Sequence, residues 1–91
     1  MLEAVKRALR LTVNTYDEEL QELIDSALLD LDIAGVSGYQ DADPLVVTAV
    51  KTYCRMHFGS PDDYDRLAAS YDAQKGALQI ATGYTNWGDQ T

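Results

Sequence analysis

Apolar residues recur along this chain at the three- and four-residue spacing of amphipathic helices. The clearest stripe lies in residues 16-34, where acidic residues occupy the remaining sides. The pattern predicts a helix that buries one face and leaves the other in water. The apolar stripe consists of Leu20, Leu23, Ile24, Ala27, Leu28 and Leu31.

Three further segments have helical patterns. Residues 2-10 place Leu2, Val5 and Leu9 on one face. Residues 44-58 are apolar on most sides, which is typical of a helix at the centre of a bundle or between subunits. Residues 61-82 carry a mixed stripe made of Tyr64, Leu67, Ala68, Tyr71, the stem of Lys75, Leu78 and Ala81 or Thr82. The predicted fold class is therefore all-α, a small bundle of about four helices (2-10, 16-34, 44-58, 61-82) with a short C-terminal tail.

Capping residues indicate where these helices begin and end. Thr15 stands three residues before a glutamate, the spacing of a capping box. Asp43 and Ser60 each precede a proline, which the first helical turn accepts without losing a hydrogen bond. Glycines suited to the position after a helix C-terminus follow three segments, at Gly35, Gly59 and Gly83. We expect one helical domain over residues 1-83 and a tail over residues 84-91.

The charge is strongly acidic and unevenly distributed. The formal net charge is −8, and residues 11–43 contain acidic side chains without a single lysine or arginine. Such a surface repels phosphates, which argues against sequence-specific reading of free DNA. The simplest interpretation is that acidity keeps a small protein soluble. Patches of opposite sign on one body would also suit head-to-tail self-association.

The sequence offers little for catalysis or metal binding. Cys54 is the only cysteine, so an internal disulfide is excluded, and His57 is the only histidine. Their spacing is one helical turn, and we interpret them as a pair within the core, because two ligands alone make weak support for a metal. Asp62 and Asp63 fit a helix N-terminus better than a calcium loop. We assign no catalytic, cofactor-binding or metal-binding residue, and a carboxylate-pair hydrolase is a remote alternative.

No segment resembles a signal peptide or reaches the ~20 apolar residues of a membrane span. Tyr53, Tyr64 and Tyr71 lie on predicted helical faces and are expected to pack in the core or a groove. Tyr84 and Trp87 follow the last helix. They either anchor a partner protein or fold back onto their own bundle.

Several stretches of the sequence resemble one protein family. The most specific are His57-Phe58-Gly59, Tyr64-Asp65-Arg66-Leu67 and Ala81-Thr82-Gly83-Tyr84-Thr85, with weaker support from Tyr16-Asp17-Glu18-Glu19-Leu20 and Pro44-Leu45-Val46. Together they resemble the phage head–tail connector family, also described as DNA-packaging or adaptor proteins and common in prophages. The resemblance covers most of the chain.

This resemblance implies a structural subunit with no enzyme activity and no cofactor. Such subunits form a homo-oligomeric ring beneath the portal protein, contact a downstream connector or tail protein, and leave a channel through which DNA passes. The protein would be made in the bacterial host cytoplasm and reside at the head–tail junction of the virion, with no membrane contact. The isolated subunit can be monomeric, because ring closure can require the portal as a template.

Two sets of residues are candidates for function within such a ring. Glu18, Glu22 and Asp25 are candidates to face the DNA channel, and Tyr84 and Trp87 are candidates to dock on a partner. The alternative function is a small acidic protein-interaction module, such as a DNA mimic or regulatory adaptor, which would bind a basic partner as a monomer or dimer. The sequence leaves open whether the first helix packs on its own bundle or on a neighbour.

Overall fold

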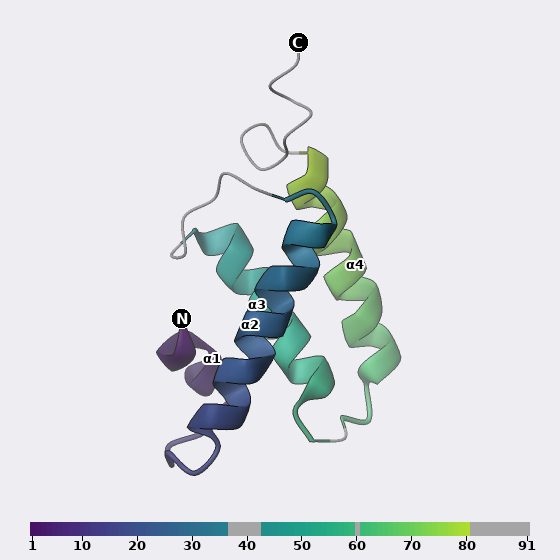
Figure 1. Ribbon diagram of the computed structural model, residues 1–91. Helices are drawn as coiled ribbons and strands as arrows, with labels where there is room; N and C mark the ends of the chain where they lie inside the picture. The colour runs from purple at the N-terminus through teal and green to yellow at the C-terminus, as the bar shows by residue number, and fades with distance from the viewer. Residues whose placement is uncertain (37–42, 60, 81–91) are drawn as a thin grey trace.

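A computed structural model of the chain describes residues 1–36, 43–59 and 61–80. Within these ranges the chain forms four helices, namely α1 (Leu2–Leu9), α2 (Asp17–Ile33), α3 (Pro44–His57) and α4 (Tyr64–Ile80). The prediction of an all-α bundle of four helices is confirmed. Figure 1 shows α2 and α4 as the two long rods, with α3 between them and the short α1 beside the lower half of the bundle.

The core is built around α3, which contacts each of the other three helices. Its apolar residues cover most of its circumference, and its exposed residues are Pro44, Leu45, Thr48, Arg55 and the terminal His57. The predicted central position of this helix is confirmed. Its fully buried side chains meet those of all three neighbours, and the core consists of Val5, Leu20, Ile24, Ala27, Leu31, Val36, Val46, Ala49, Val50, Cys54, Met56, Leu67, Tyr71 and Leu78.

The first helix packs on its own chain. Val5 is fully buried, and α1 contacts both α2 and α3. Lys6 is also buried, with its Nζ 2.8 Å from Asp17 Oδ1 and 2.6 Å from Asn14 Oδ1. Because a buried ammonium is costly without such partners, these contacts hold α1 against the start of α2.

Several predicted helix boundaries are confirmed and others are wrong. Asp43 caps α3, its Oδ1 accepting a hydrogen bond from the Leu45 N–H at 3.1 Å. Gly35 has the expected positive φ of 92° after α2. The capping box at Thr15 is not formed, because α2 begins at Asp17 after Tyr16, which makes no side-chain cap. The preceding turn instead places Asn14 and Asp17 on Lys6.

The fourth helix begins later than the sequence indicated. Residues 61–63 form a turn, and α4 starts at Tyr64. Tyr64 is 43% exposed rather than in the core, because it lies at the end of the bundle, where its ring faces the exposed His57 edge-on at a centroid distance of 6.2 Å. The predicted cap at Ser60 and the predicted helix end at Thr82 and Gly83 lie outside the described residues.

Polar contacts join α4 to α2. The Tyr71 hydroxyl donates to Asp30 Oδ2 at 2.6 Å, and Lys75 Nζ lies 3.3 Å from the same oxygen. One turn further on, Gln79 Nε2 donates to the Ala34 carbonyl at 2.6 Å. The hydrogen bond from Tyr71, with help from Lys75, lowers the pKa of Asp30 against the opposing effect of burial. Burial and the Asp30 carboxylate raise the pKa of Tyr71.

These contacts predict an acid-sensitive link between α2 and α4. Because the pKa of Asp30 is lowered by folding, its ionised form stabilises the native state above its ordinary pKa of 3.8, and that contribution is lost as the pH falls through the lower native value. Asp30→Asn should therefore reduce the difference in urea midpoint measured between about pH 7 and about pH 3. Asp25→Asn, which changes an exposed carboxylate on the same helix, is the matched control. An equal pH dependence in both variants would contradict the assignment.

The environment of Gly76 predicts that replacing this residue by alanine stabilises the protein. A methyl group at this position meets nothing within 4 Å, and the residue lies inside α4 with ordinary helical geometry. Gly76→Ala should raise the free energy of unfolding by up to about 1 kcal/mol, since glycine is a poor helix former. Gly59→Ala is the control and should lower it, because Gly59 has a φ of 74°. Urea unfolding measures both, and a destabilised Gly76→Ala would show that this reasoning is wrong.

Candidate functional site

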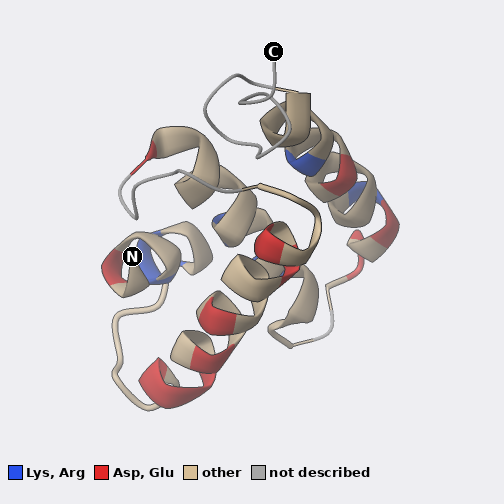
Figure 2. Cartoon of the chain, turned by 45° about the horizontal axis from the view of Figure 1, so that its top comes forward, with Lys and Arg blue, Asp and Glu red and all other residues tan. Residues whose placement is uncertain are grey.

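One face of α2 carries an exposed row of carboxylates. Glu18, Glu22 and Asp25 are four and three residues apart, so they share the side of the helix that points away from the core. Leu20 and Ile24 on the opposite side are buried and hold the helix in place. Figure 2 shows the acidic residues of α2 in red, spread along the length of the helix. The three residues selected from the sequence therefore form one continuous surface, which we call the acidic face.

The acidic face has no neutralising cations among the described residues. Its one described side-chain contact is a hydrogen bond from Gln21 Nε2 to Asp25 Oδ1 at 3.0 Å. The ion pairs of the described chain all lie elsewhere and involve other carboxylates, namely Lys6 with Asp17, Arg66 with Asp63, and Lys75 with Asp30. A row of unpaired carboxylates on a rigid helix produces a negative potential that repels a passing polyanion and attracts a basic protein.

The C-terminal part of the same helix exposes apolar side chains that the sequence analysis did not single out. Leu29 is 58% exposed and Ile33 is 76% exposed, one helical turn apart. Their position in the sequence could have indicated this exposure, because both residues fall on the polar side of α2, away from its buried apolar stripe. Large exposed apolar side chains beside charges are a common feature of surfaces that bind other proteins.

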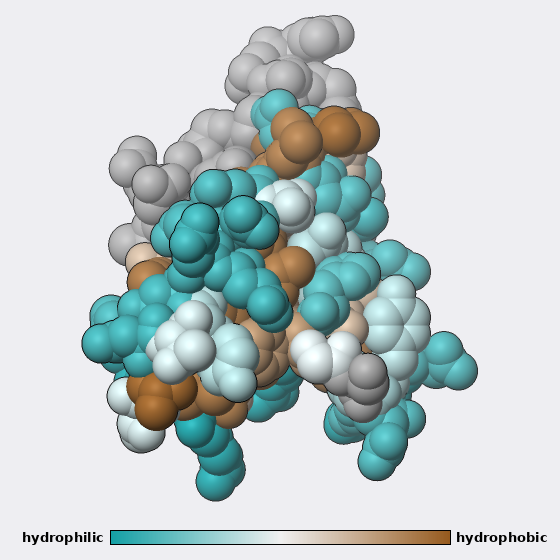
Figure 3. All heavy atoms as spheres, turned by 60° about the horizontal axis from the view of Figure 1, so that its bottom comes forward, coloured by the Kyte–Doolittle hydropathy of each residue, from teal (hydrophilic) through white to brown (hydrophobic). Residues whose placement is uncertain are grey.

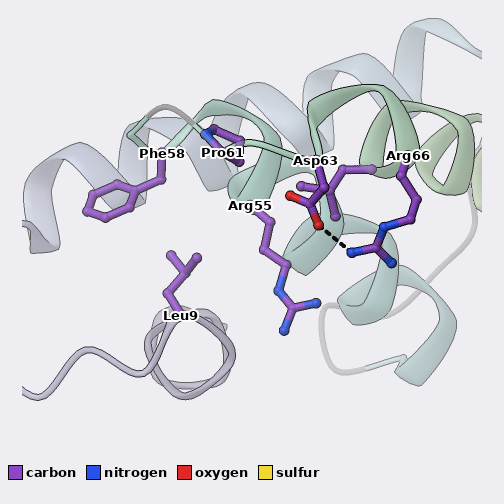
Figure 4. A pocket seen from close by; sticks show the side chains of 7 residues that line it. Leu9, Arg55, Phe58, Pro61, Asp63 and Arg66 are labelled. Atoms are coloured by element: carbon purple, nitrogen blue, oxygen red, sulfur yellow. Dashed lines mark hydrogen bonds and ion pairs between the residues drawn. The ribbon is translucent and has the colours of Figure 1, made fainter.

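A pocket lies at the lower end of the bundle, where α1 and α3 end and α4 begins (Figure 4). Its volume is about 400 Å³. Figure 3 views the molecule from this end and shows apolar atoms exposed among hydrophilic side chains. Four lining residues are apolar and three are charged; they are Leu9, Phe58, Pro61 and Leu67, with Arg55, Asp63 and Arg66.

The charges of the pocket differ from those of the molecule as a whole. Arg66 is paired with Asp63, as the dashed line in Figure 4 shows. Arg55 Nη2 donates to the Ala8 carbonyl in the last turn of α1 at 3.3 Å. No carboxylate lies within ion-pair distance of Arg55 in the described parts of the chain. The pocket is therefore net positive in an acidic protein, and it combines an apolar floor with an unpaired guanidinium.

Cys54 and His57 do not form the core pair expected from their spacing. Cys54 is fully buried, and burial raises the pKa of its thiol to about 12, so the nucleophilic thiolate is suppressed. His57 is exposed at the last residue of α3, with its ring against Tyr53 at a centroid distance of 4.4 Å. Residues three apart on a helix point in directions that differ by about 60°. Here that difference places one side chain in the core and the other in solvent.

The described residues give no support for a metal or membrane site. Nowhere in these parts of the chain do three His, Cys, Asp or Glu side chains come together in a group that could hold a metal ion. None of the helices in the same ranges is long and apolar enough to cross a membrane. The candidate docking residues Tyr84 and Trp87 lie outside the described residues.

Comparison with known proteins gives one match. A family model with the description "Phage connector protein" matches residues 1–85, which include all four helices. No match was found among curated proteins or among solved structures.

Proposed function

This chain belongs to the phage connector protein family, and on that premise we propose that it is a head–tail connector subunit that forms a ring beneath the portal of the virion. The ring would join the portal to a downstream connector or tail protein and surround the channel through which DNA passes after packaging. The family is a structural one, and the proposed work of this chain is to hold surfaces in place.

The observation that best supports this proposal is the acidic face of α2. Glu18, Glu22 and Asp25 are exposed, aligned and unpaired with any described cation. A channel wall for DNA must not bind its phosphates, because each attractive contact would slow the passing strand. Carboxylates held on a helix that is fixed by its buried side meet that requirement. We therefore propose that the acidic face lines the channel.

A row of carboxylates would also suit a small acidic module that imitates DNA and occupies a basic partner. This alternative differs in assembly, because such a module acts as a monomer or dimer. Sedimentation over a concentration series, with and without the portal protein, separates the two functions. A closed ring supports the connector, and a protein that remains small beside its portal favours the alternative.

Reversing the charge of the acidic face should impair DNA release. Replacement of Glu18, Glu22 and Asp25 by lysine places three cations where DNA would pass, so we expect slower or incomplete release from purified particles, with the yield of particles unchanged. The matched control replaces Asp62, Asp65 and Asp72, three exposed carboxylates on the α4 side, by lysine. Normal DNA release by the α2 variant, or an equal defect in both variants, would show that the acidic face does not line the channel.

The tail provides a separate prediction about docking. We propose that Tyr84 and Trp87 anchor the subunit to the portal, because aromatic side chains are effective anchors at protein interfaces. Deleting residues 84–91 should weaken co-sedimentation with the portal protein while leaving helix content by circular dichroism unchanged. Portal binding equal to that of the full chain would show that the tail is not the docking element.

A further inference from the structure

We propose that the pocket between α1, α3 and α4 receives a projecting segment of a second copy of this chain. The segment is the acidic turn, defined here as residues 13–19, which joins α1 to α2 and includes the first residues of α2. This inference deepens the proposed ring and rests on it, because it assigns the surfaces through which neighbouring subunits would meet.

The acidic turn carries exposed groups that would complement the apolar and cationic side chains of the pocket. Val13 is 50% exposed, and Glu18 and Glu19 are exposed at the N-terminus of α2. Asp17, between these groups, is already paired with Lys6, which fixes the turn to its own bundle. The turn therefore presents an apolar side chain followed by two carboxylates on a rigid base. None of these three exposed residues has a described ion pair or hydrogen bond through its side chain.

The pocket supplies the complementary groups. Its apolar floor, formed by Leu9, Phe58 and Leu67, can cover a side chain of the size of Val13, and its volume of about 400 Å³ accommodates a short segment of a neighbour. Arg55 offers guanidinium donors that no described carboxylate uses, which suits a carboxylate such as that of Glu19. Burial of an apolar side chain beside a matched charge pair is a common arrangement at protein interfaces.

The two surfaces adjoin at the same end of the molecule, where the Tyr16 ring of the acidic turn packs edge-on against the Phe58 ring of the pocket at a centroid distance of 5.3 Å. Figure 1 shows the turn between α1 and α2 projecting at the lower left, whereas the connection between α3 and α4 lies at the lower right. Contact between two different surfaces is heterologous, so each subunit can bind one neighbour on each side. When the rotation between neighbours closes, repetition of this contact gives a ring. The contact uses Glu19, which lies outside the acidic face, so the acidic face remains available for the channel.

Disulfide trapping tests the contact directly. One preparation carries Val13→Cys and another carries Pro61→Cys, and Cys54 is retained because its buried thiol does not react. Under mild oxidation in the presence of the portal protein, a mixture of the two should give a linked dimer in several-fold excess over either preparation alone. The control mixture combines Ser26→Cys, at an exposed position elsewhere on α2, with Pro61→Cys. A yield no higher than that of the control would overturn the inference.

A chain that carries both Val13→Cys and Pro61→Cys tests the head-to-tail direction. Heterologous contact should give a ladder of linked trimers and larger species, whereas a reciprocal contact would stop at the dimer and overturn the proposal. Charge reversal provides an independent measurement. Arg55→Glu in the Pro61→Cys preparation should lower the yield about two- to fivefold, and Glu19→Arg in the Val13→Cys preparation should restore it. An unchanged yield in both would contradict the assigned pocket.

The outcome for this contact is separable from that for the proposed function. If wild-type chain forms closed rings with the portal but the cysteine pair is not linked, the subunits meet through other surfaces and only this inference fails. If the chain neither forms a ring with the portal nor links, both fail.

Discussion

Burial of α3 among the other three helices is the interaction on which the rest of this structure depends. An apolar helix of this length cannot remain exposed in water, and no single neighbour can cover it on three sides. Its apolar residues therefore require α1, α2 and α4 together, which explains why a helix as short as α1, unstable alone, is ordered against α2 and α3. One edge of α3 carries Lys51 and Arg55 and brings these cations to the surface at a defined place.

Polar contacts then set how the outer helices lie on this core. Lys6 holds α1 to the start of α2 through Asn14 and Asp17. Asp30 holds α4 through Tyr71 and Lys75. Each of these contacts uses a cation, and together with the pair between Arg66 and Asp63 they involve three of the seven lysines and arginines of the chain. The carboxylates of the acidic face are left uncompensated as a consequence of where the few lysines and arginines are used.

The proposed channel surface and the proposed subunit contact both follow from this distribution of charge. The face of α2 that is turned away from α3 gathers carboxylates, and the meeting point of α1, α3 and α4 gathers an unpaired guanidinium beside apolar side chains. One helix bundle can therefore present a surface that repels DNA and a separate surface that binds protein. Both functions need rigid placement of side chains, which the buried core provides, and neither needs a reactive group.

The sequence by itself determined the four helices, the central position of α3, the caps at Asp43 and Gly35, and the alignment of Glu18, Glu22 and Asp25, because these depend on residues close together in the chain. Only the tertiary structure decided the pocket, the burial of Lys6, the link from Asp30 to Tyr71 and the exposure of His57 and Tyr64. Helical periodicity reports which side of a helix is apolar, but it does not report which neighbour covers that side or where the cover ends. The pocket joins Leu9 to Arg55 and Arg66, and no local pattern records that residues so far apart in sequence will meet.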